Sequence, residues 1–236
     1  MQRPALQCTI TRDPAIVRAA RALRHQVFVV ERGATSGAEP GLEGCPQDAL
    51  CEHAVVTDPA RPEAGVLATA RFWDRTDWTE REFDLSALTG RNLRLAEVGR
   101  TCVHPKHRGG LAAATLFGGV VTALRARGAS ALVGAASFAG RDPAVHMAAL
   151  RALRAEALAP EEWRPVARGP LAVPVSGEAP RGAIAGVPTL IKTYLRAGAW
   201  VGDGACVDLA FNVVDVCVVL DLARLRMPRA AAAMMA

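Results

Sequence analysis

The stretch from Leu95 to Gly110 constrains the fold of this chain more than any other part of the sequence. It reads L-A-E-V-G-R-T-C-V-H-P-K-H-R-G-G. Apolar and β-branched residues up to Val103 predict a strand, and a proline followed by two glycines predicts a turn that leads into a helix. Glu97 and Arg100 lie on the predicted strand, where one interpretation is that they form only a structural ion pair. The stretch therefore predicts a strand-turn-helix unit of an α/β domain.

The turn after this strand has the chemistry of an anion site. The first turn of a helix exposes unpaired N–H groups, and Gly109 and Gly110 allow a ligand to approach the backbone. Lys106 and Arg108 add positive charge beside them. A phosphopantetheine arm is an anion that fits, and Glu97 could accept a proton from an amine that attacks a thioester on that arm. The functional interpretation of the stretch is therefore acyl transfer.

Length and composition indicate one globular domain with acidic partners. With 236 residues, of which 51% are hydrophobic and 22% charged, the chain can bury a full core. A net charge of +5 favours carrier proteins and anionic membrane surfaces, although a GC-rich genome also explains the many arginines. Aromatic residues are few, and they do not alternate with basic residues, which argues against nucleic acid as a partner.

The cysteines and the apolar runs predict a cytoplasmic protein without a metal. The six cysteines show no C-x-x-C spacing and follow no N-terminal signal region, so we expect reduced thiols and no zinc site. The run from Val213 to Leu222 contains Asp215 and Asp221 and is too short to span a bilayer. A freely soluble protein and one in peripheral contact with the inner membrane both stay open.

Hydrophobic periodicity predicts alternating strands and helices along the chain. Asp13 and Pro14 predict the start of a helix whose inward end carries Arg24, and residues 33–47 predict a loop suited to substrate entry. Predicted strands are residues 6–11, 53–57, 65–73, 94–103, 131–135, 163–167 and one or two within 205–220. Predicted helices after the first are residues 83–88, 111–127, 143–158 and 189–197, and residues 228–236 are predicted to be a frayed tail.

Six blocks of the sequence, taken in order, resemble one protein family. The blocks are residues 23–34, 48–53, 97–105, 136–143, 188–199 and 211–216, and they include R-H-Q-V-F and E-V-G-R-T-C-V-H-P. Together they resemble the L-ornithine Nα-acyltransferase family of bacterial ornithine-lipid synthesis, which is related to the acyl-homoserine-lactone synthases. Six ordered blocks are much harder to match by chance than one glycine motif. The chain departs from the family's D-x-D-like loop, since it has Glu39, Glu43 and Asp48 there, so the acidic partner in this loop stays open.

The resemblance implies a fold and an activity. The expected fold is α/β of the GNAT type, a mixed central sheet flanked by helices, in a single domain of residues 1–227. The expected reaction transfers a 3-hydroxyacyl chain from acyl carrier protein to the α-amine of ornithine and gives lyso-ornithine lipid. No permanently bound cofactor is expected, because the 4′-phosphopantetheine arm arrives as part of the donor.

The resemblance and the residue chemistry together assign a candidate site. Glu97 is expected to take a proton from the amine, directly or through a water, Arg100 to anchor a carboxylate, and His53 to act as an auxiliary base or as a core histidine. The resemblance places Arg24, Phe28, Asp48 and Arg71 around the amino acid, and Ser137 and Phe138 along the acyl chain. The residues expected to bind the carrier protein or its arm are Val103, Lys106, Arg108, Gly109, Gly110, Lys192 and Arg196.

Two other functions stay open at this point. An acyl-homoserine-lactone synthase would share the fold and the donor and would cyclise S-adenosylmethionine, but the blocks at 188–199 and 211–216 favour the ornithine branch. A non-catalytic acyl-binding or lipid-binding protein could also use this fold. Arg71, Glu97 and Arg100 argue against it, because a binding module does not need a carboxylate that activates an amine.

Overall fold

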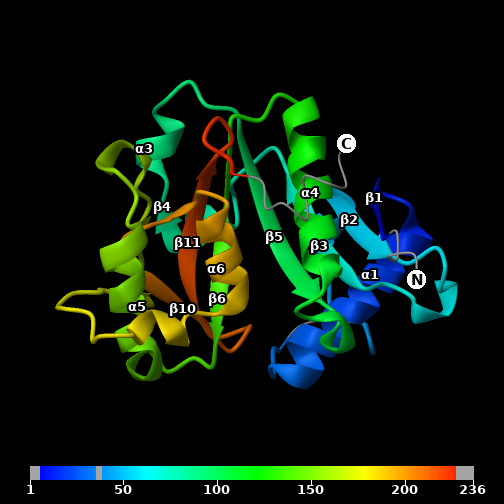
Figure 1. The fold of residues 1–236 in the computed structure, drawn as a ribbon, viewed down its shortest axis with the longest axis horizontal. Helices are drawn as coiled ribbons and strands as arrows, with labels where there is room; N and C mark the ends of the chain where they lie inside the picture. The colour runs from blue at the N-terminus through cyan, green and yellow to red at the C-terminus, as the bar shows by residue number, and fades with distance from the viewer. Residues whose placement is uncertain (1–5, 36–38, 227–236) are drawn as a thin grey trace. The chain divides into compact units, whose positions relative to one another are not determined.

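The computed structural model describes residues 6–35 and 39–226 of the chain (Figure 1). The described residues form two compact units. Unit 1 contains the described residues up to Trp73 together with Val98–Arg127, and unit 2 contains Asp74–Glu97 and Gly128–Arg226. The strand β5 (Leu95–Val103) therefore begins in unit 2 and ends in unit 1. The predicted tail at 228–236 lies outside the described residues, and the single domain stays a prediction.

Unit 1 is built on antiparallel strands. The strand β2 (Glu52–Thr57) pairs with β1 (Gln7–Thr11) on one side and with β3 (Ala68–Trp73) on the other. The second part of β5 follows next to β3. The β2–β3 register places His53 opposite Arg71, so their positions in the sheet are fixed by backbone pairing.

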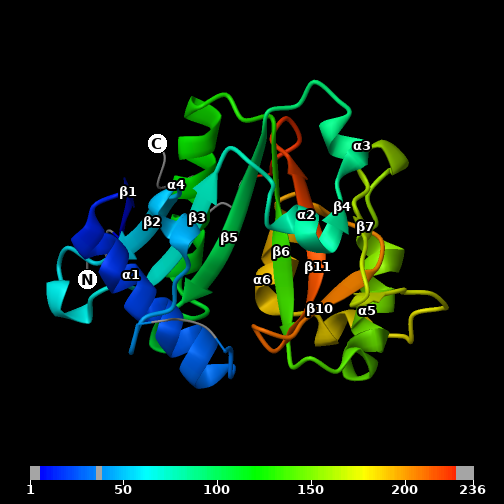
Figure 2. The ribbon, with the colours of Figure 1, turned by 180° about the vertical axis from the view of Figure 1, so that it is seen from behind.

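Helices lie on both faces of these strands. Figure 1 shows α4 (Leu111–Ala126) in front of the strands, and Figure 2, from behind, shows α1 (Pro14–Arg24) in front of β2 and β3. The helix α1 begins where Asp13 accepts hydrogen bonds from the backbone N–H groups of Ala15 and Ile16, at 2.8 and 3.2 Å. It continues into a π-helix, η1 (His25–Glu31). Short 3₁₀ helices complete the unit: η2 (Pro46–Ala49), η3 (Pro62–Ala64) and η4 (Pro105–His107).

Unit 2 is organised around β11 (Val213–Asp221), all but the last of whose residues are buried. It pairs antiparallel with β6 (Ala131–Ala139) along their full lengths, and with β10 (Ala205–Asp208) on its other edge. The first part of β5 runs parallel to β6. The remaining strands are β8 (Ala172–Val173) next to β10, β9 (Trp200–Val201) next to β11, and β4 (Phe83–Asp84) paired with β7 (Val166–Ala167).

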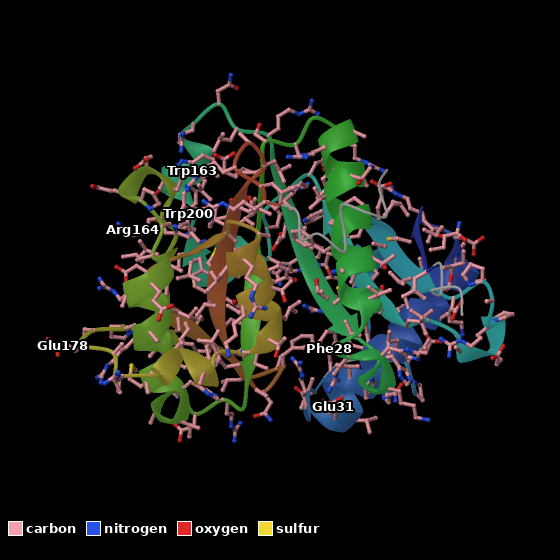
Figure 3. The ribbon with its side chains drawn as sticks, in the orientation of Figure 1. Phe28, Glu31, Trp163, Arg164, Glu178 and Trp200 are labelled. Carbon is pink, nitrogen blue, oxygen red and sulfur yellow. The ribbon has the colours of Figure 1, made fainter. Side chains whose placement is uncertain are left out.

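Helices and a tight apolar cluster cover this second set of strands. The helix α6 (Thr189–Arg196) contacts β6 and β11, and α2 (Thr79–Glu82) contacts β6 and lies in front of it in Figure 2. Trp163 and Trp200 lie next to each other with ring centroids 5.6 Å apart (Figure 3). The other helical segments of unit 2 are α3 (Ser86–Thr89), α5 (Pro143–Ala157), η5 (Glu161–Trp163) and η6 (Ala183–Gly186).

Most predicted elements are confirmed to within a few residues, because their hydrophobic periods match the faces that they bury. The predicted helix start at Asp13 and Pro14 is confirmed by the cap described above. The predicted strands at 6–11, 53–57 and 94–103 correspond to β1, β2 and β5, and the predicted helices at 111–127, 143–158 and 189–197 correspond to α4, α5 and α6.

Three predicted elements are wrong in kind or extent. Residues 83–88 do not form one helix, because Phe83 is fully buried and pairs with Ala167 before the short helix α3 begins. The strand predicted at 131–135 extends to Ala139, since β11 pairs with its whole length. The strand predicted at 163–167 is only β7, because residues 161–163 form a 3₁₀ turn.

Within the described residues, no helix combines the length and the apolar character that crossing a membrane requires.

Candidate functional site

Five charged side chains in unit 1 form one network of ion pairs, which we call the arginine-carboxylate network. The guanidinium of Arg24 donates to both oxygens of Asp48, at 3.0 and 2.7 Å, and its Nε lies 2.5 Å from Oε2 of Glu43. Arg71 Nη1 lies 2.6 Å from Oδ1 of Asp48, and Arg100 Nε lies 3.2 Å from Oε1 of Glu43. Two carboxylates therefore bridge three guanidinium groups.

Local structure places these side chains. Arg24 is the last residue of α1 and points inward, with 1% of its surface exposed. Asp48 lies in η2, where its carboxylate also accepts the backbone N–H of Cys45 at 3.1 Å. Arg71 lies in the fully buried β3, and its Nη1 also lies 2.9 Å from Cys45 Sγ. The loop before β2 is therefore folded down onto α1 and β3 by its acidic residues.

Burial and charge act against each other in this network. Burial disfavours the charged form of Asp48, but Arg24 and Arg71 hold its pKa well below the ordinary value. The same opposition lowers the pKa of Glu43, where Arg24 and Arg100 outweigh burial. Burial and the nearby cations Arg71 and Arg24 lower the pKa of Arg100. All five groups are charged near neutral pH, and together they carry one more positive than negative charge.

Arg100 has an unusual backbone conformation. Its φ is +53°, a left-handed value that residues other than glycine and asparagine adopt at a cost. Such a residue within a strand is typical of a β-bulge, which redirects side chains locally. The side chain is 24% exposed, whereas those of Arg24 and Arg71 are 1% and 2% exposed. Strained positions of this kind are frequent at functional sites.

His53 lies directly beside the network. Its Nε2 is 3.0 Å from the backbone carbonyl oxygen of Asp48, and 1% of the residue is exposed. A carbonyl oxygen only accepts, so Nε2 carries the proton in this contact. Burial lowers the pKa of His53, which leaves the ring neutral near pH 7 with Nδ1 as an acceptor. The residue has the features of a core histidine and also keeps a nitrogen that can take a proton.

Glu97 is held by backbone and side-chain donors within unit 2. Its Oε1 accepts the N–H of Thr79 at 2.6 Å and the Thr79 hydroxyl at 2.5 Å, and its Oε2 accepts the N–H of Trp78 at 3.1 Å. The residue is 4% exposed. The expected structural partner, Arg100, donates to Glu43 instead. The start of α2 therefore fixes the orientation of this carboxylate.

The turn after β5 has the predicted form. Val103 ends the strand, η4 contains Lys106, and Gly109 adopts a left-handed φ of +75° before Gly110 caps α4 without a side-chain hydrogen bond. Arg108 is already engaged, because its two Nη atoms lie 2.7 and 2.6 Å from the carboxylate of Glu31. The N-terminal N–H groups of α4 lack a side-chain cap.

Four other predicted residues lie within unit 2, and Phe28 lies in unit 1. Ser137 and Phe138 are inside β6 rather than at its end, and Phe138 is buried against the ring of His146 with centroids 5.1 Å apart. Lys192 and Arg196 are one turn apart on α6, and Lys192 Nζ donates to the carbonyl of Ala185. Phe28 is a buried residue of η1, where it is labelled in Figure 3 near Glu31.

Two residues of the site were not predicted from the sequence. Glu43, which is fully buried, was only one of several acidic residues in a glycine-rich and proline-rich loop. Its spacing of five residues from Asp48 is the available signal for a paired acidic loop. Thr79 binds Glu97 mainly through its place at the start of α2, and no sequence pattern announces that contact.

One group of carboxylates in the described part of unit 2 has spacing that could hold a cation. Oxygens of Glu82, Asp208 and Asp215 lie within 4.8 Å of one another. Asp208 also caps the turn before β11, where it accepts the N–H groups of Ala210 and Phe211. The expectation that the protein uses no metal stays a prediction.

Sequence comparisons identify a domain family and named proteins that this chain resembles. The acetyltransferase (GNAT) domain family matches residues 23–118, which include all five residues of the arginine-carboxylate network. An L-ornithine N(alpha)-acyltransferase of Rhodobacter capsulatus is 38% identical over 229 aligned residues, which cover 90% of this chain and 88% of that protein. A protein of the same name from Rhizobium meliloti is 34% identical, with 93% and 81% covered.

Solved structures share the fold at low sequence identity. FeeM, an N-acyl amino acid synthase from uncultured soil microbes, superimposes with a TM-score of 0.55 at 12% identity, covering 92% of this chain and 91% of that one. The CoA-dependent acyl-homoserine lactone synthase BjaI gives 0.54 at 13% identity, with 97% and 88% covered. The predicted α/β fold of the GNAT type, with a mixed sheet flanked by helices, is confirmed.

Proposed function

Because the chain belongs to the L-ornithine N(alpha)-acyltransferase family, we propose that it transfers a 3-hydroxyacyl chain from acyl carrier protein to the α-amine of L-ornithine. The proposal rests above all on the 38% identity to the Rhodobacter capsulatus relative over nearly the whole of both chains. That the chain is an acyltransferase follows from the family. The amino acid, the acyl donor and the lyso-ornithine lipid product are the proposed parts.

The arginine-carboxylate network supports an amino-acid acceptor. An amino acid carries a carboxylate and an ammonium, and the network offers groups of both signs. Arg100 is its most exposed cation and lies at the strained position, so we assign it to the substrate carboxylate. Arg24, Asp48 and Arg71 hold the surrounding loop in place, and Phe28 is assigned to the wall of this site.

Glu97 is the proposed base. An α-ammonium must lose a proton before nitrogen can attack, and a carboxylate near the amine takes it directly or through a water. Nitrogen then attacks the thioester carbonyl, the C–N bond forms, the C–S bond breaks, and the pantetheine sulfur leaves as a thiol after it receives a proton. Donors from Trp78 and Thr79 fix the carboxylate for this task. His53, whose neutral Nδ1 can accept a proton, stays the proposed auxiliary base.

The turn after β5 is the proposed site of the phosphopantetheine arm. The start of α4 offers backbone N–H groups beside Gly109 and Gly110, and Val103 and Lys106 flank them. Arg108 contributes positive charge while paired to Glu31. Lys192 and Arg196 are the proposed contacts to the acidic carrier protein, and Ser137 and Phe138 the proposed contacts to the acyl chain. Since the product is amphiphilic, the proposal includes peripheral contact with the inner membrane.

A reconstituted reaction tests the function. Purified protein is incubated with 3-hydroxyacyl carrier protein and, separately, with ornithine, lysine, glycine or S-adenosylmethionine, and products are identified by mass spectrometry. We expect an Nα-acyl amide with ornithine. Glu97→Gln keeps the shape but cannot accept a proton, so turnover should fall about 10²- to 10⁴-fold. An absence of amide with every amino acid, or a loss below tenfold in Glu97→Gln, would contradict the reaction or the base respectively.

A further inference from the structure

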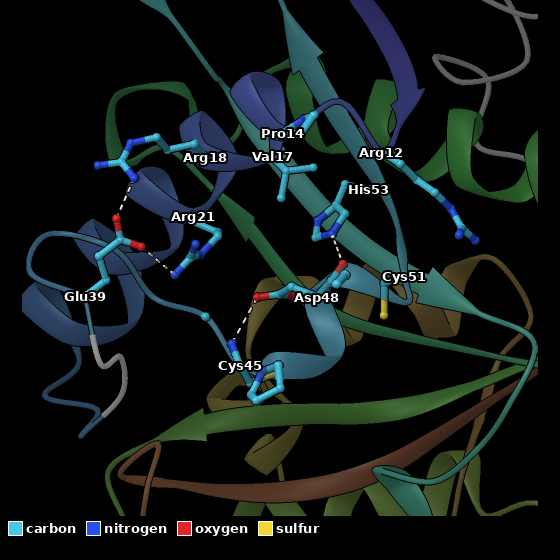
Figure 4. A pocket seen from close by; sticks show the side chains of 13 residues that line it. Arg12, Pro14, Val17, Arg18, Arg21, Glu39, Cys45, Asp48, Cys51 and His53 are labelled. Atoms are coloured by element: carbon cyan, nitrogen blue, oxygen red, sulfur yellow. Dashed lines mark hydrogen bonds and ion pairs between the residues drawn. The ribbon is translucent and has the colours of Figure 1, made fainter.

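A pocket of about 630 Å³ opens within unit 1, beside α1 and Asp48 (Figure 4). Its walls are largely apolar and come from Pro14 and Val17 of α1 and from the segment that carries Pro46, Ala49 and Cys51. Three arginines, Arg12, Arg18 and Arg21, also line it, together with Glu39, Asp48 and His53. None of these features has a role in the proposed acyl transfer except Asp48 and His53.

One residue that lines the pocket, His53, has a buried ring nitrogen without a hydrogen-bond partner among the described residues. His53 lines the pocket, and Figure 4 shows its ring beside Val17 with Nε2 joined to the Asp48 carbonyl oxygen. Because Nε2 donates in that contact, the neutral ring presents Nδ1 as an acceptor. Within the described part of the chain, Nδ1 is buried and has no hydrogen-bond partner. A buried polar atom without a partner is costly, and a ligand that donates a hydrogen bond would satisfy it.

The rim of the pocket favours an anion. Arg18 and Arg21 share the carboxylate of Glu39, at 2.5 and 3.3 Å. Within residues 6–35 and 39–226, the guanidinium of Arg12 has no ion pair. Asp48 is already paired with Arg24 and Arg71, so the lining arginines Arg12, Arg18 and Arg21 bring three positive charges against one exposed carboxylate, that of Glu39.

We propose that this pocket binds a small carboxylate that carries an amino or hydroxyl group on the adjoining carbon. The rim arginines bind the carboxylate, and the amino or hydroxyl group donates to Nδ1 of His53. The class includes free α-amino acids and α-hydroxy acids, and the probes below distinguish these sources. His53 also donates a hydrogen bond to the Asp48 backbone, so a ligand bound to His53 is linked through this residue to the loop that holds the arginine-carboxylate network.

Equilibrium binding tests this site without any acyl transfer. The full chain is labelled with ¹⁵N-histidine, and the His53 resonances are assigned from their loss in His53→Gln. L-Alanine, L-lactate and L-ornithine are titrated against propionate, which has the carboxylate but no adjoining donor, and ethylamine, which has no carboxylate. We expect alanine, lactate or both to shift the Nδ1 resonance with an affinity at least about tenfold above propionate and ethylamine. Ornithine should match alanine, since the proposed contacts do not use its side chain.

Two pairs of variants localise the binding. Ala49→Phe places a ring in the pocket and should abolish the shift, while Leu50→Phe changes the next residue, which is 57% exposed and does not line the pocket, and should leave it intact. Arg12→Gln should weaken binding about tenfold, and Arg125→Gln, a surface arginine of α4, should not.

Three results would overturn the proposal. The first is an equal response to propionate, which would show that Nδ1 does not accept from the ligand. The second is binding that survives in Ala49→Phe. The third is no response to alanine or lactate at millimolar concentrations. Amide formation plays no part in these measurements, so their failure is separate from failure of the proposed acyltransferase reaction.

Discussion

Replacing Asp48 by asparagine tests how strongly the arginine-carboxylate network determines the stability of the protein. The Asp48 carboxylate accepts four hydrogen bonds, two from Arg24, one from Arg71 and one from the backbone of Cys45, and the residue is 8% exposed. Asparagine has the same shape but only one acceptor oxygen, and its amide N–H groups would face other donors. The network would then have three cations and one anion.

The expected loss follows from the burial of the partners. Breaking a buried ion pair by removing one member costs about 3 to 5 kcal/mol, because the remaining charge stays desolvated. Arg24 keeps Glu43 at 2.5 Å, which limits the loss, whereas Arg71 loses its carboxylate. We therefore expect the free energy of unfolding to fall by about 3 kcal/mol. An exposed pair provides the contrast: Glu31→Gln removes a bidentate contact to Arg108, with side chains 38% and 42% exposed, and should cost below about 1 kcal/mol.

Urea unfolding followed by circular dichroism and tryptophan fluorescence measures both variants. The slope against urea concentration should stay that of the parent, so that the midpoint alone reports stability. A loss of unfolding free energy below about 1 kcal/mol in Asp48→Asn, or equal losses in Asp48→Asn and Glu31→Gln, would refute the argument that burial makes the ion pairs of this network costly to break.

Four further predictions concern pH, orientation and the donor. The arginines lower the pKa of Asp48 in the folded protein, so the contribution of this carboxylate to the free energy of unfolding is complete above about pH 4 and is lost as pH falls through the folded pKa. Below about pH 4 the parent should therefore lose stability more steeply than Asp48→Asn in acid unfolding curves. Thr79→Val should lower kcat about tenfold without a matching rise in KM, and Thr79→Ser should restore it, because the hydroxyl orients Glu97; a stability change without a change in kcat would contradict this. Charge reversal at Lys192 and Arg196 should raise KM for acyl carrier protein and weaken its salt dependence, and a lower kcat at saturating donor would exclude α6 as the docking site. Lys106→Ala should also impair reaction with a small pantetheine thioester, and parental activity on that donor would move the phosphate site elsewhere.

The elements of the fold could be predicted where one hydrophobic period dominates. The hydrophobic pattern of Leu111–Ala126 and of Leu95–Val103 matches the faces that these elements bury, so the predicted bounds agree with the observed ones to within one residue. The helix predicted at Phe83–Leu88 is wrong, because Phe83 pairs with Ala167, which lies far along the chain, and this pairing decides the conformation of the segment. The segment from Glu161 to Gly186 contains short strands and turns fixed by contacts such as Val166 with Asp203, and these leave no local pattern.

The candidate site was predictable in its members but not in its pairing. Arg24, Asp48 and Arg71 were named from the sequence, and the structure brings them within hydrogen-bond distance. The pairing of Arg100 with Glu43 could not be predicted, because Glu43 is 57 residues earlier and lies in a loop whose composition is that of an exposed segment. A sequence shows which charges exist, whereas the loop's path decides which of them are buried together.

The arrangement of buried charge favours a role in positioning over a role in stability. Apolar residues of similar volume often stabilise a protein as well as a buried ion network does, so stability alone does not explain five ionised groups around η2. The network fixes the loop before β2 against α1 and β3, and it leaves Arg100 as the partly exposed cation at a strained backbone position. If Arg100 binds the substrate carboxylate as proposed, both features restrict the orientation of that contact, since Glu43 holds the guanidinium and the left-handed backbone fixes the start of the side chain. An acceptor anchored there would have few orientations available, which is what a transfer reaction between two separate substrates requires.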